Sequence, residues 1–530
     1  MLIFRTLLHY LLILGFFHSI LFADNTLIRI NGNEPETLYP LADTNSLASN
    51  IRRDLFEPLM SKDREGNVIL GQAKSYTLDK TKTIYTFILR DDAKWSDGSP
   101  VTAYDFEYTY RYMADPKNHI SRAQYLKRLN ILNIHAIING EKPVKKLGIK
   151  VFNEKTIQIT LEKPTYYFLA GLSHICMSPL SEKIIKKSKS LLDTTQNFIS
   201  NGAYQLQNWE REKQIVLKKN PYYYDVKKVQ IETVIYLPID KESKAFNMYM
   251  SGEVDYLEEV PKNKYNQLKK EYPDELKTSN LLGSYYLSFN LKKELFNQLN
   301  LRKALSYAID REVLAKKVMG TGEKPLYNFV PKGMQNYITP IPEYQKWTQA
   351  QRESKARTLF KEFGFTTKNP LQFELLYNAN EQNRRVLLSV ISMWKKVFHE
   401  GINVKLKALN WNAYQKEKIN YSIVRSGWIA DINDASNMLE IFTQNHSYNN
   451  SFYKNKLFEK KFAKAKITKD LKIREALYQK LDLIITEDMP IIPLFQFTTA
   501  RLVKPYVKGY KNTPLDTIFS KYLSIEKSHD

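Results

Sequence analysis

The sequence predicts a mixed α/β protein built from two or three lobes. Its 530 residues exceed the roughly 250 to 300 residues at which a single hydrophobic core stops growing. Segments that alternate like strands are interleaved with segments of helical spacing, and no Gly/Ser-rich linker interrupts them. The lobes must therefore be joined by short strands that act as hinges, which leaves a cleft between lobes available for a ligand.

The first part of the chain carries clear local signals. Residues 26–30 alternate as a strand, and residues 51–59 have a helical spacing that a proline stops. Strand-forming residues at 83–89 predict a second strand. Asp97-Gly98 predicts a tight turn after it, and a helix is expected to begin at Thr102.

Three later segments predict structural elements and contain no expected catalytic or ligand-binding residues. Asn201-Gly202-Ala203-Tyr204 predicts a turn into a strand, with Gly202 free to adopt a positive φ. Apolar residues from Leu301 to Leu314 recur at helical spacing and form one stripe that packs into a core. Residues 490–503 are rich in strand formers and are expected to return to pair with the amino-terminal lobe.

Residues 1–23 have the pattern of a secretory signal peptide. Arg5 supplies the charge, the residues from Thr6 to Phe22 are almost wholly apolar, and cleavage is expected after Ala23. A retained membrane anchor is the alternative, because the apolar run is close to the roughly 20 residues that span a bilayer; two histidines within the run weaken it. No cysteine stands at the junction, so a lipid anchor is not encoded. A soluble periplasmic protein is the simplest prediction.

The charge distribution does not favour nucleic acid as a partner. The formal net charge is +23, but Lys and Arg are spread over the whole chain and interleaved with Asp and Glu. Such a basic field favours anionic ligands or an anionic membrane surface instead.

The residues needed for catalysis or metal binding are not found in the required patterns. The sequence has no Gly-x-Ser-x-Gly and no His-Glu-x-x-His, and its eight histidines are scattered. The single cysteine, Cys176, excludes an intramolecular disulfide and lies in an apolar run, where a packed side chain is expected. We therefore predict no enzyme, no metal site and no cofactor. A secreted hydrolase of peptides or cell wall is the alternative that this pattern disfavours.

One short run combines the chemistry needed to hold a peptide. Arg425-Ser426-Gly427-Trp428-Ile429-Ala430-Asp431 begins on a cation and ends on an anion. Gly427 lets a second backbone approach closely, Trp428 offers a flat apolar wall, and Asp431 can accept hydrogen bonds from an ammonium group. The hypothesis is that an extended peptide lies along this run. The alternative is an ordinary buried strand that leads into a turn.

Several motifs, taken together and in order, carry a family resemblance. The run from Tyr85 to Phe106, which ends in LRDDAKWSDGSPVTAYDF, resembles the signature of the family-5 extracellular solute-binding proteins, the peptide and nickel binders of ABC importers. Within that family the chain is most similar to the oligopeptide binders. The likeness covers essentially the whole mature chain and continues through 201–204, 219–223, 251–255, 301–311, 426–431 and 500–505.

The resemblance implies a three-lobed periplasmic-binding-protein-like fold (type II, cluster C) with a hinge and an interlobe ligand cleft. Lobe I is expected to be discontinuous. The expected boundaries are 24–56, 181–282 and 498–530 for lobe I, 57–180 for lobe II and 283–497 for lobe III.

The resemblance also implies where a peptide lies. Asp431 matches the carboxylate that pairs with the ligand's α-amino group, and Gly427 and Ile429 match backbone positions that pair with the ligand as a strand would. Trp428 and Trp411 match walls of side-chain pockets.

The positive partner of the ligand's carboxylate is less specified. Arg425 matches a family arginine that could make a bidentate pair, and Lys418 is a looser candidate. The chain also departs from the oligopeptide binders, since Arg122 stands where they carry a tyrosine near the ligand amine and Asn383 where they carry a histidine.

The function implied is that of a non-enzymatic periplasmic receptor that acts as a monomer. It captures oligopeptides in an extended conformation and delivers them to the transmembrane subunits of an ABC permease. The added charge of Arg122 leaves a receptor for anionic cell-wall muropeptides open as an alternative, and a nickel or haem receptor remains a further one.

Overall fold

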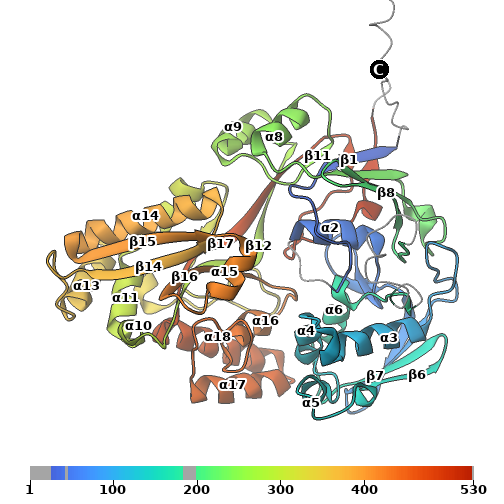
Figure 1. Ribbon diagram of the computed structural model, residues 1–530, viewed down its shortest axis with the longest axis horizontal. Coiled ribbons are helices and arrows are strands. Elements are labelled where there is room, and N and C mark those ends of the chain that lie inside the picture. Colours follow the sequence, from blue (N-terminus) through green and yellow to red (C-terminus); the bar gives the residue numbers. More distant parts are fainter. Residues whose placement is uncertain (1–24, 42–45, 183–184, 186–197, 528–530) are drawn as a thin grey trace, which may run out of the picture.

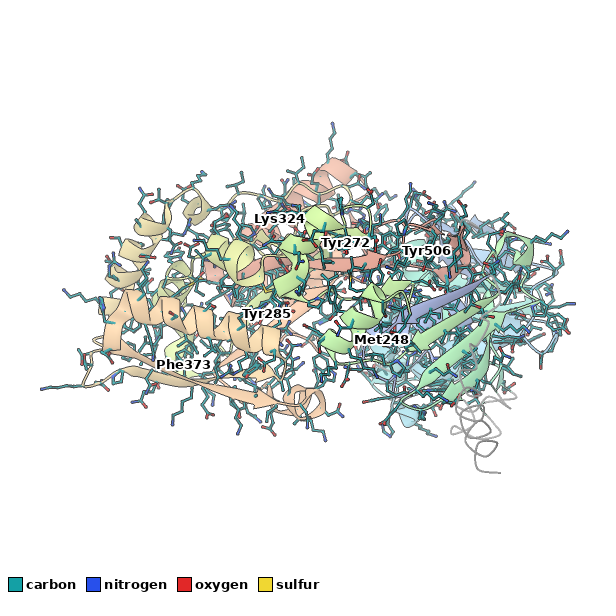
Figure 2. The ribbon with its side chains drawn as sticks, turned by 90° about the horizontal axis from the view of Figure 1, so that it is seen from above. Met248, Tyr272, Tyr285, Lys324, Phe373 and Tyr506 are labelled. Carbon is teal, nitrogen blue, oxygen red and sulfur yellow. The ribbon has the colours of Figure 1, made fainter. Side chains whose placement is uncertain are left out.

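The computed structural model describes residues 25–41, 46–182, 185 and 198–527. The predicted signal peptide, at 1–23, lies outside these residues. Figure 1 shows two halves connected by β12 (Leu276–Phe289) and β17 (Ile491–Val503), which pair in antiparallel fashion along most of their length. Viewed from above, Tyr285 and Phe373 lie in one half, and Met248 and Tyr506 lie in the other (Figure 2).

A single eleven-stranded sheet runs through both halves. Its strand order is β15-β14-β16-β12-β17-β11-β1-β10-β9-β8, and β13 pairs with β17. The remaining strands of this sheet are β1 (Thr26–Ile30), β8 (Tyr204–Glu210), β9 (Gln214–Lys219), β10 (Thr233–Leu237), β11 (Tyr256–Leu257), β13 (Lys324–Pro325), β14 (Leu371–Asn378), β15 (Ile402–Leu409) and β16 (Ile423–Ile429). β12 and β17 are therefore the structural connection between the halves.

A smaller sheet in the order β4-β5-β7-β6 forms part of the half on the right of Figure 1. Its strands are β4 (Ala73–Leu78), β5 (Ile84–Leu89), β6 (Ile149–Asn153) and β7 (Thr156–Thr160), and the hairpin β2 (Met60–Lys62) and β3 (Val68–Leu70) precedes it. The helices of this half are α2 (Ser46–Leu55), α3 (Ala103–Ala114), α4 (Ala123–Arg128), α5 (Ile134–Ile138) and α6 (Phe168–Leu172). One continuous apolar core joins these elements to β1, β8, β9 and β10.

The half on the left of Figure 1 is covered by helices on both sides of its strands. These helices are α10 (Glu294–Asn297), α11 (Leu299–Tyr307), α13 (Gln349–Lys361), α14 (Glu381–Phe398), α15 (Trp411–Glu417), α16 (Ala435–Leu439), α17 (Lys456–Ile467) and α18 (Leu471–Asp488). The buried indole of Trp394 in α14 donates to Leu305 O in α11 at 2.8 Å, which fixes these two helices together. Helices α8 (Glu242–Met250) and α9 (Tyr265–Glu271) lie near the junction of the halves.

Most local predictions are confirmed. The strand at 26–30 is β1, the strand at 83–89 is β5, and the segment 490–503 contains β17, which pairs with β11 beside β1. The helix expected at Thr102 is α3, where the backbone N–H and the hydroxyl of Thr102 both donate to Asp105 Oδ2. The helix expected at 51–59 is α2, which begins earlier and ends at Leu55.

The prediction for Gly202 is wrong in its physical reason. The positive-φ glycines of the described chain do not include Gly202. A Cβ at this position would instead lie 2.6 Å from Asp54 O and 2.6 Å from the carbonyl carbon of Leu55. Glycine is therefore required here for the close approach of two backbones, not for a left-handed conformation.

Replacing Gly202 with alanine is expected to lower the free energy of unfolding by about 1 to 3 kcal/mol, because the backbone at Leu55 cannot yield without moving α2. Chemical unfolding would measure the change. Gly401→Ala is the control, since its added methyl would meet the Phe360 ring at 3.3 Å and a side chain can shift more easily than a backbone. An equal loss in the two variants would contradict the argument.

The ladder between β12 and β17 changes register between Asn280 and Ser284. This irregularity lies at the boundary expected between lobes I and III, at residues 282 and 283 of β12. The residues of β17 that lie opposite are those around residue 497, where the second expected boundary between these lobes falls. A register shift weakens local pairing and permits bending. The segments expected to form lobes I and II, in contrast, contribute to one common apolar core, and a smaller separate cluster lies around helices α8 and α9.

Two further properties bear on the expected character of the protein. Within the described ranges, no helix combines the length and apolarity needed to cross a bilayer. Cys176 is buried, and burial raises the pKa of its thiol to about 12, which agrees with a packed and unreactive side chain.

Candidate functional site

One edge of strand β16 is unpaired along the second half of the strand. β16 pairs with β12 from Ile423 to Ile429, but on its other side β14 reaches only Ile423 and Val424. The N–H of Ala430 donates to Leu282 O at 2.8 Å. Because alternate residues of an antiparallel strand face the same neighbour, Arg425, Gly427 and Ile429 direct their N–H and C=O groups away from β12. The Arg425 carbonyl accepts a hydrogen bond from the Tyr414 hydroxyl, and the other groups form an open backbone edge among the described residues.

The side chains along this edge leave the backbone accessible. Ile429 is 41% exposed, and Gly427 is partly exposed. A Cβ at Gly427 would lie 2.8 Å from Cζ of Phe497, so any other residue here would require that ring to move. A Cβ at Gly283 would lie 2.8 Å from Cγ1 of Ile429, so the neighbouring strand also depends on a glycine here.

Asp431 lies directly after β16, at one end of the open edge. Its N–H donates to Asn437 Oδ1 at 3.0 Å, which fixes the turn. Its Oδ2 accepts a hydrogen bond from Arg128, and His174 Nε2 lies 3.8 Å from Oδ1. No other described residue donates to Oδ1, so this oxygen can accept a hydrogen bond from a ligand.

Arg128 connects two parts of the chain that are far apart in sequence. It is the last residue of α4, and its guanidinium pairs with both Asp431 and Glu440, across the line where α4 faces α16 in Figure 1. It also lies 5.8 Å from the ring centre of Trp428. No pattern in the sequence distinguishes this residue, because a single arginine in a Lys-Arg pair looks like an ordinary surface cation.

The charges around Asp431 set its ionisation. Burial opposes the charged form, but the positive field of Arg128, with that of Arg122, holds the pKa of Asp431 below its usual range. Burial lowers the pKa of His174 to about 3, although Asp431 acts in the opposite direction. At neutral pH, Asp431 is therefore an anion and His174 is neutral.

Arg425 lies at the other end of the open edge. Its Nη1 donates to Asn378 Oδ1 at 3.2 Å, and its guanidinium lies 4.4 Å from the ring centre of Tyr285. Its carbonyl accepts a hydrogen bond from Tyr414. Its Nε is buried and has no partner among the described residues, and no described carboxylate pairs with the guanidinium. This cation is therefore available to an anionic ligand group.

Asn383 supports this arrangement and does not present a free polar group. Its amide donates to Asn378 O and Oδ1, both at 3.1 Å, and its oxygen accepts from Tyr285 at 3.2 Å. Asn383 is buried, so it orients Asn378 and, through it, Arg425.

The remaining predicted residues lie around the same edge. The indole of Trp428 donates to Asn437 O at 3.0 Å and packs 5.1 Å from Tyr448. Trp411 begins α15 and is 59% exposed, stacked on Tyr414 at 5.8 Å. Lys418 directly follows α15 and donates to Gln415 Oε1 at 2.7 Å. These residues form the rim of the edge.

Arg122 lies just before α4 and contributes positive charge at the Asp431 end. The structure thus brings Arg122, Asp431 and Trp428 together at one end and Arg425 and Asn383 together at the other. Among the described residues, no group of three or more His, Cys, Asp or Glu side chains could hold a metal ion.

The chain is similar to known proteins along nearly its whole length. The chain is 38% identical to the periplasmic oligopeptide-binding protein OppA of Salmonella typhimurium, over 95% of this chain and 93% of that protein. The structure of the Escherichia coli murein tripeptide binding protein MppA is similar, with a TM-score of 0.89, 34% identity and coverage of 96% of this chain and 100% of that one. The Haemophilus influenzae OppA complex with RPPGFSPFR gives a TM-score of 0.87, with 34% identity over 95% of this chain and 99% of that one.

The unliganded open form of MppA is less similar, with a TM-score of 0.75, 34% identity and coverage of 94% of this chain and 97% of that one. The present arrangement of the halves is thus nearer to that of the other two structures. Residues 67–450 match the model of the bacterial extracellular solute-binding proteins, family 5 Middle. The open strand edge, bordered by an anion and a cation, therefore lies in a chain that belongs to the family-5 bacterial extracellular solute-binding proteins.

Proposed function

We propose that this chain is the periplasmic substrate-binding component of an ABC importer and that it captures short peptides in an extended conformation. The open edge of β16 carries this proposal, because the N–H of Arg425 and the N–H and C=O groups of Gly427 and Ile429 have no partner in the described chain and match what an added strand needs. Backbone pairing of this kind gives affinity that depends little on the sequence of the ligand.

The charges at the two ends give the ligand a direction. Asp431 Oδ1 is free to accept from an α-ammonium group, and Arg425 can donate to a carboxylate. The peptide then runs antiparallel to β16. The seven residues from Arg425 to Asp431 span about 20 Å at roughly 3.3 Å per residue, which suits peptides of a few residues.

Closure around the peptide is expected to occur by bending of β12 and β17 at the register shift near Asn280. Arg128 meets Asp431 and Glu440 only when α4 lies against α16, so these contacts belong to the closed arrangement. We propose that this closed form is presented to the permease. The proposal includes a monomeric, non-enzymatic receptor whose residues 1–23 direct export and are removed.

Titration calorimetry with peptides of two to six residues tests the proposal. We expect binding of peptides with free ends, and weaker binding when either the amino end is acetylated or the carboxyl end is amidated, because each change removes a charge that the edge would pair. A failure to bind any peptide, with a folded protein, would contradict the function.

A receptor for cell-wall muropeptides is the second candidate. Arg122 adds positive charge to the amine end, and the similarity to the murein tripeptide binding protein MppA extends over 96% of the chain. A muropeptide carries more carboxylates than an ordinary peptide of the same length, so a cationic site favours it. Competition between murein tripeptide and tri-alanine would distinguish the two ligands.

A further inference from the structure

Helix α17 has a buried face and an exposed face, and the peptide-binding role described above does not use the exposed one. Phe458, Phe462 and Ala465 are buried and pack into the same apolar core as α18. Figure 1 shows α17 along the lower edge of the left half of the molecule. The opposite face of the helix therefore points away from the core.

The exposed face combines lysines with large apolar side chains. Leu457, Lys460, Lys464 and Ile467 lie three or four residues apart, so they form one stripe along the helix. Leu457 and Ile467 are each more than half exposed. The solvent face of a helix normally carries polar residues, and this stripe departs from that rule at both ends.

The same mixture continues beyond α17. Leu471 and Ile473 are exposed in the first turn of α18. The N–H of Ile338 donates to Glu475 Oε1 at 2.9 Å, which places this loop residue against α18. Ile338 and Ile341 are 73% and 65% exposed, the highest values for large apolar side chains among the described residues. We refer to the stripe on α17 and these four apolar residues as the hairpin surface.

The positive charge of the hairpin surface is not compensated. Residues 456–473 contain seven lysines and only two carboxylates. Glu459 accepts from Gln444 N at 2.7 Å and Asp470 from Ile473 N at 3.0 Å, so both carboxylates are bound to backbone amides. Within the described parts of the chain, no lysine of this segment forms an ion pair.

We propose that the hairpin surface binds the surface of an anionic phospholipid bilayer. The lysines attract anionic headgroups, and the apolar side chains enter the boundary between headgroups and acyl chains. A protein interface concentrates apolar and aromatic residues at its centre and is poor in lysine, so this composition favours lipid as the partner.

This role goes beyond peptide capture and is independent of it. The hairpin surface lies on α17, α18 and the loop at Ile338, whereas the open edge belongs to β16. All of these elements lie in one half of the molecule, so binding to a bilayer leaves the other half free to move.

Flotation with lipid vesicles tests the proposal. The chain from residue 24 onward keeps every residue that the structure describes and excludes the apolar run of residues 1–23. It is mixed with phosphatidylcholine vesicles that either contain or lack about 30% phosphatidylglycerol. We expect a partition constant at least about tenfold higher for the anionic vesicles, because each lysine near such a surface contributes about a factor of five. Raising the salt from about 0.05 M to about 0.5 M should remove most of this difference.

A pair of charge-reversed variants makes the test specific. Lys460→Glu combined with Lys464→Glu should lower the partition constant for anionic vesicles by at least about tenfold. Lys269→Glu combined with Lys270→Glu is the control, since it makes the same change of charge at exposed positions of α9. The control should stay within about a factor of two of the wild type, because its lysines lie outside the hairpin surface.

A second pair of variants tests the apolar side chains. Ile467→Ser combined with Ile473→Ser keeps the charge and should lower binding about fivefold to tenfold, since less apolar area leaves water. Tyr104→Ser combined with Phe152→Ser removes two apolar side chains that are also about half exposed, and it should leave binding unchanged.

Equal binding of the wild type to both kinds of vesicle would overturn the proposal, as would an unchanged partition constant in Lys460→Glu with Lys464→Glu. Binding to native inner-membrane vesicles, but not to vesicles made from their extracted lipid, would assign the hairpin surface to a membrane protein and overturn it as well. A melting temperature for each variant shows whether it is folded.

Discussion

Replacing Glu258 with alanine is expected to lower the free energy of unfolding by about 3 to 5 kcal/mol, because it leaves two buried guanidinium groups without their shared anion. Glu258 is 5% exposed and accepts from Arg501 Nε at 2.5 Å and from Arg29 Nη2 at 3.4 Å. It also accepts from Asn50. Chemical unfolding followed by tryptophan fluorescence would measure the loss.

Two variants make this measurement specific. Glu258→Gln keeps the shape and one acceptor, so its loss should be smaller than that of Glu258→Ala. Asp91→Ala removes an exposed carboxylate that pairs with Lys74 at 2.6 Å, and it should change stability little. If Glu258→Ala were as mild as Asp91→Ala, the buried network would not hold β1, β11 and β17 together.

Replacing Asp431 with alanine is expected to weaken binding of a peptide with a free amino end by about 2 to 5 kcal/mol, the range for truncating one partner of a buried charge pair. The reason is geometric, since Oδ1 is the unoccupied oxygen at the end of the open edge and the carboxylate is ionised at neutral pH. Titration calorimetry of Asp431→Ala and of the isosteric Asp431→Asn would measure it.

Asp431 also holds Arg128, so the experiment must separate the two roles. An amino-acetylated copy of the same peptide cannot use the ammonium contact, and its affinity should fall much less in the variants. Equal losses for the free and acetylated peptides would show that Asp431 acts by holding Arg128 and not by binding the amine.

Local structure was readable from the sequence wherever one physical rule dominated. Thr102 caps α3 with the help of an acidic side chain three residues on, and strand formers at 84–89 give β5. Gly202 is a position where the sequence does not reveal the physical cause. A glycine signals that a side chain is not tolerated, but only the fold shows whether the cause is the backbone angle or, as here, the carbonyls of Asp54 and Leu55.

The site was predictable where it lies on one strand and unpredictable where it depends on packing between distant segments. Gly427, Ile429 and Asp431 follow one another in sequence and share the open edge. Arg128 contacts Asp431 from helix α4, although the two residues are 303 positions apart in the sequence. No local sequence pattern indicates a contact over such a separation.

The place of β1 in the large sheet has a consequence for the order of folding. β1 lies between β10 and β11, and β11 pairs in turn with β17. This part of the sheet, which contains the first described strand, can therefore be completed only after β17, one of the last strands, has been made. Arg29 of β1 also donates to Ser520 Oγ at 3.0 Å. Contacts of such long sequence separation form slowly and cannot be completed while the chain is still emerging. A chain built in this way stays incompletely folded until its carboxyl-terminal segment arrives, which would suit the export as an extended polypeptide that we propose for it.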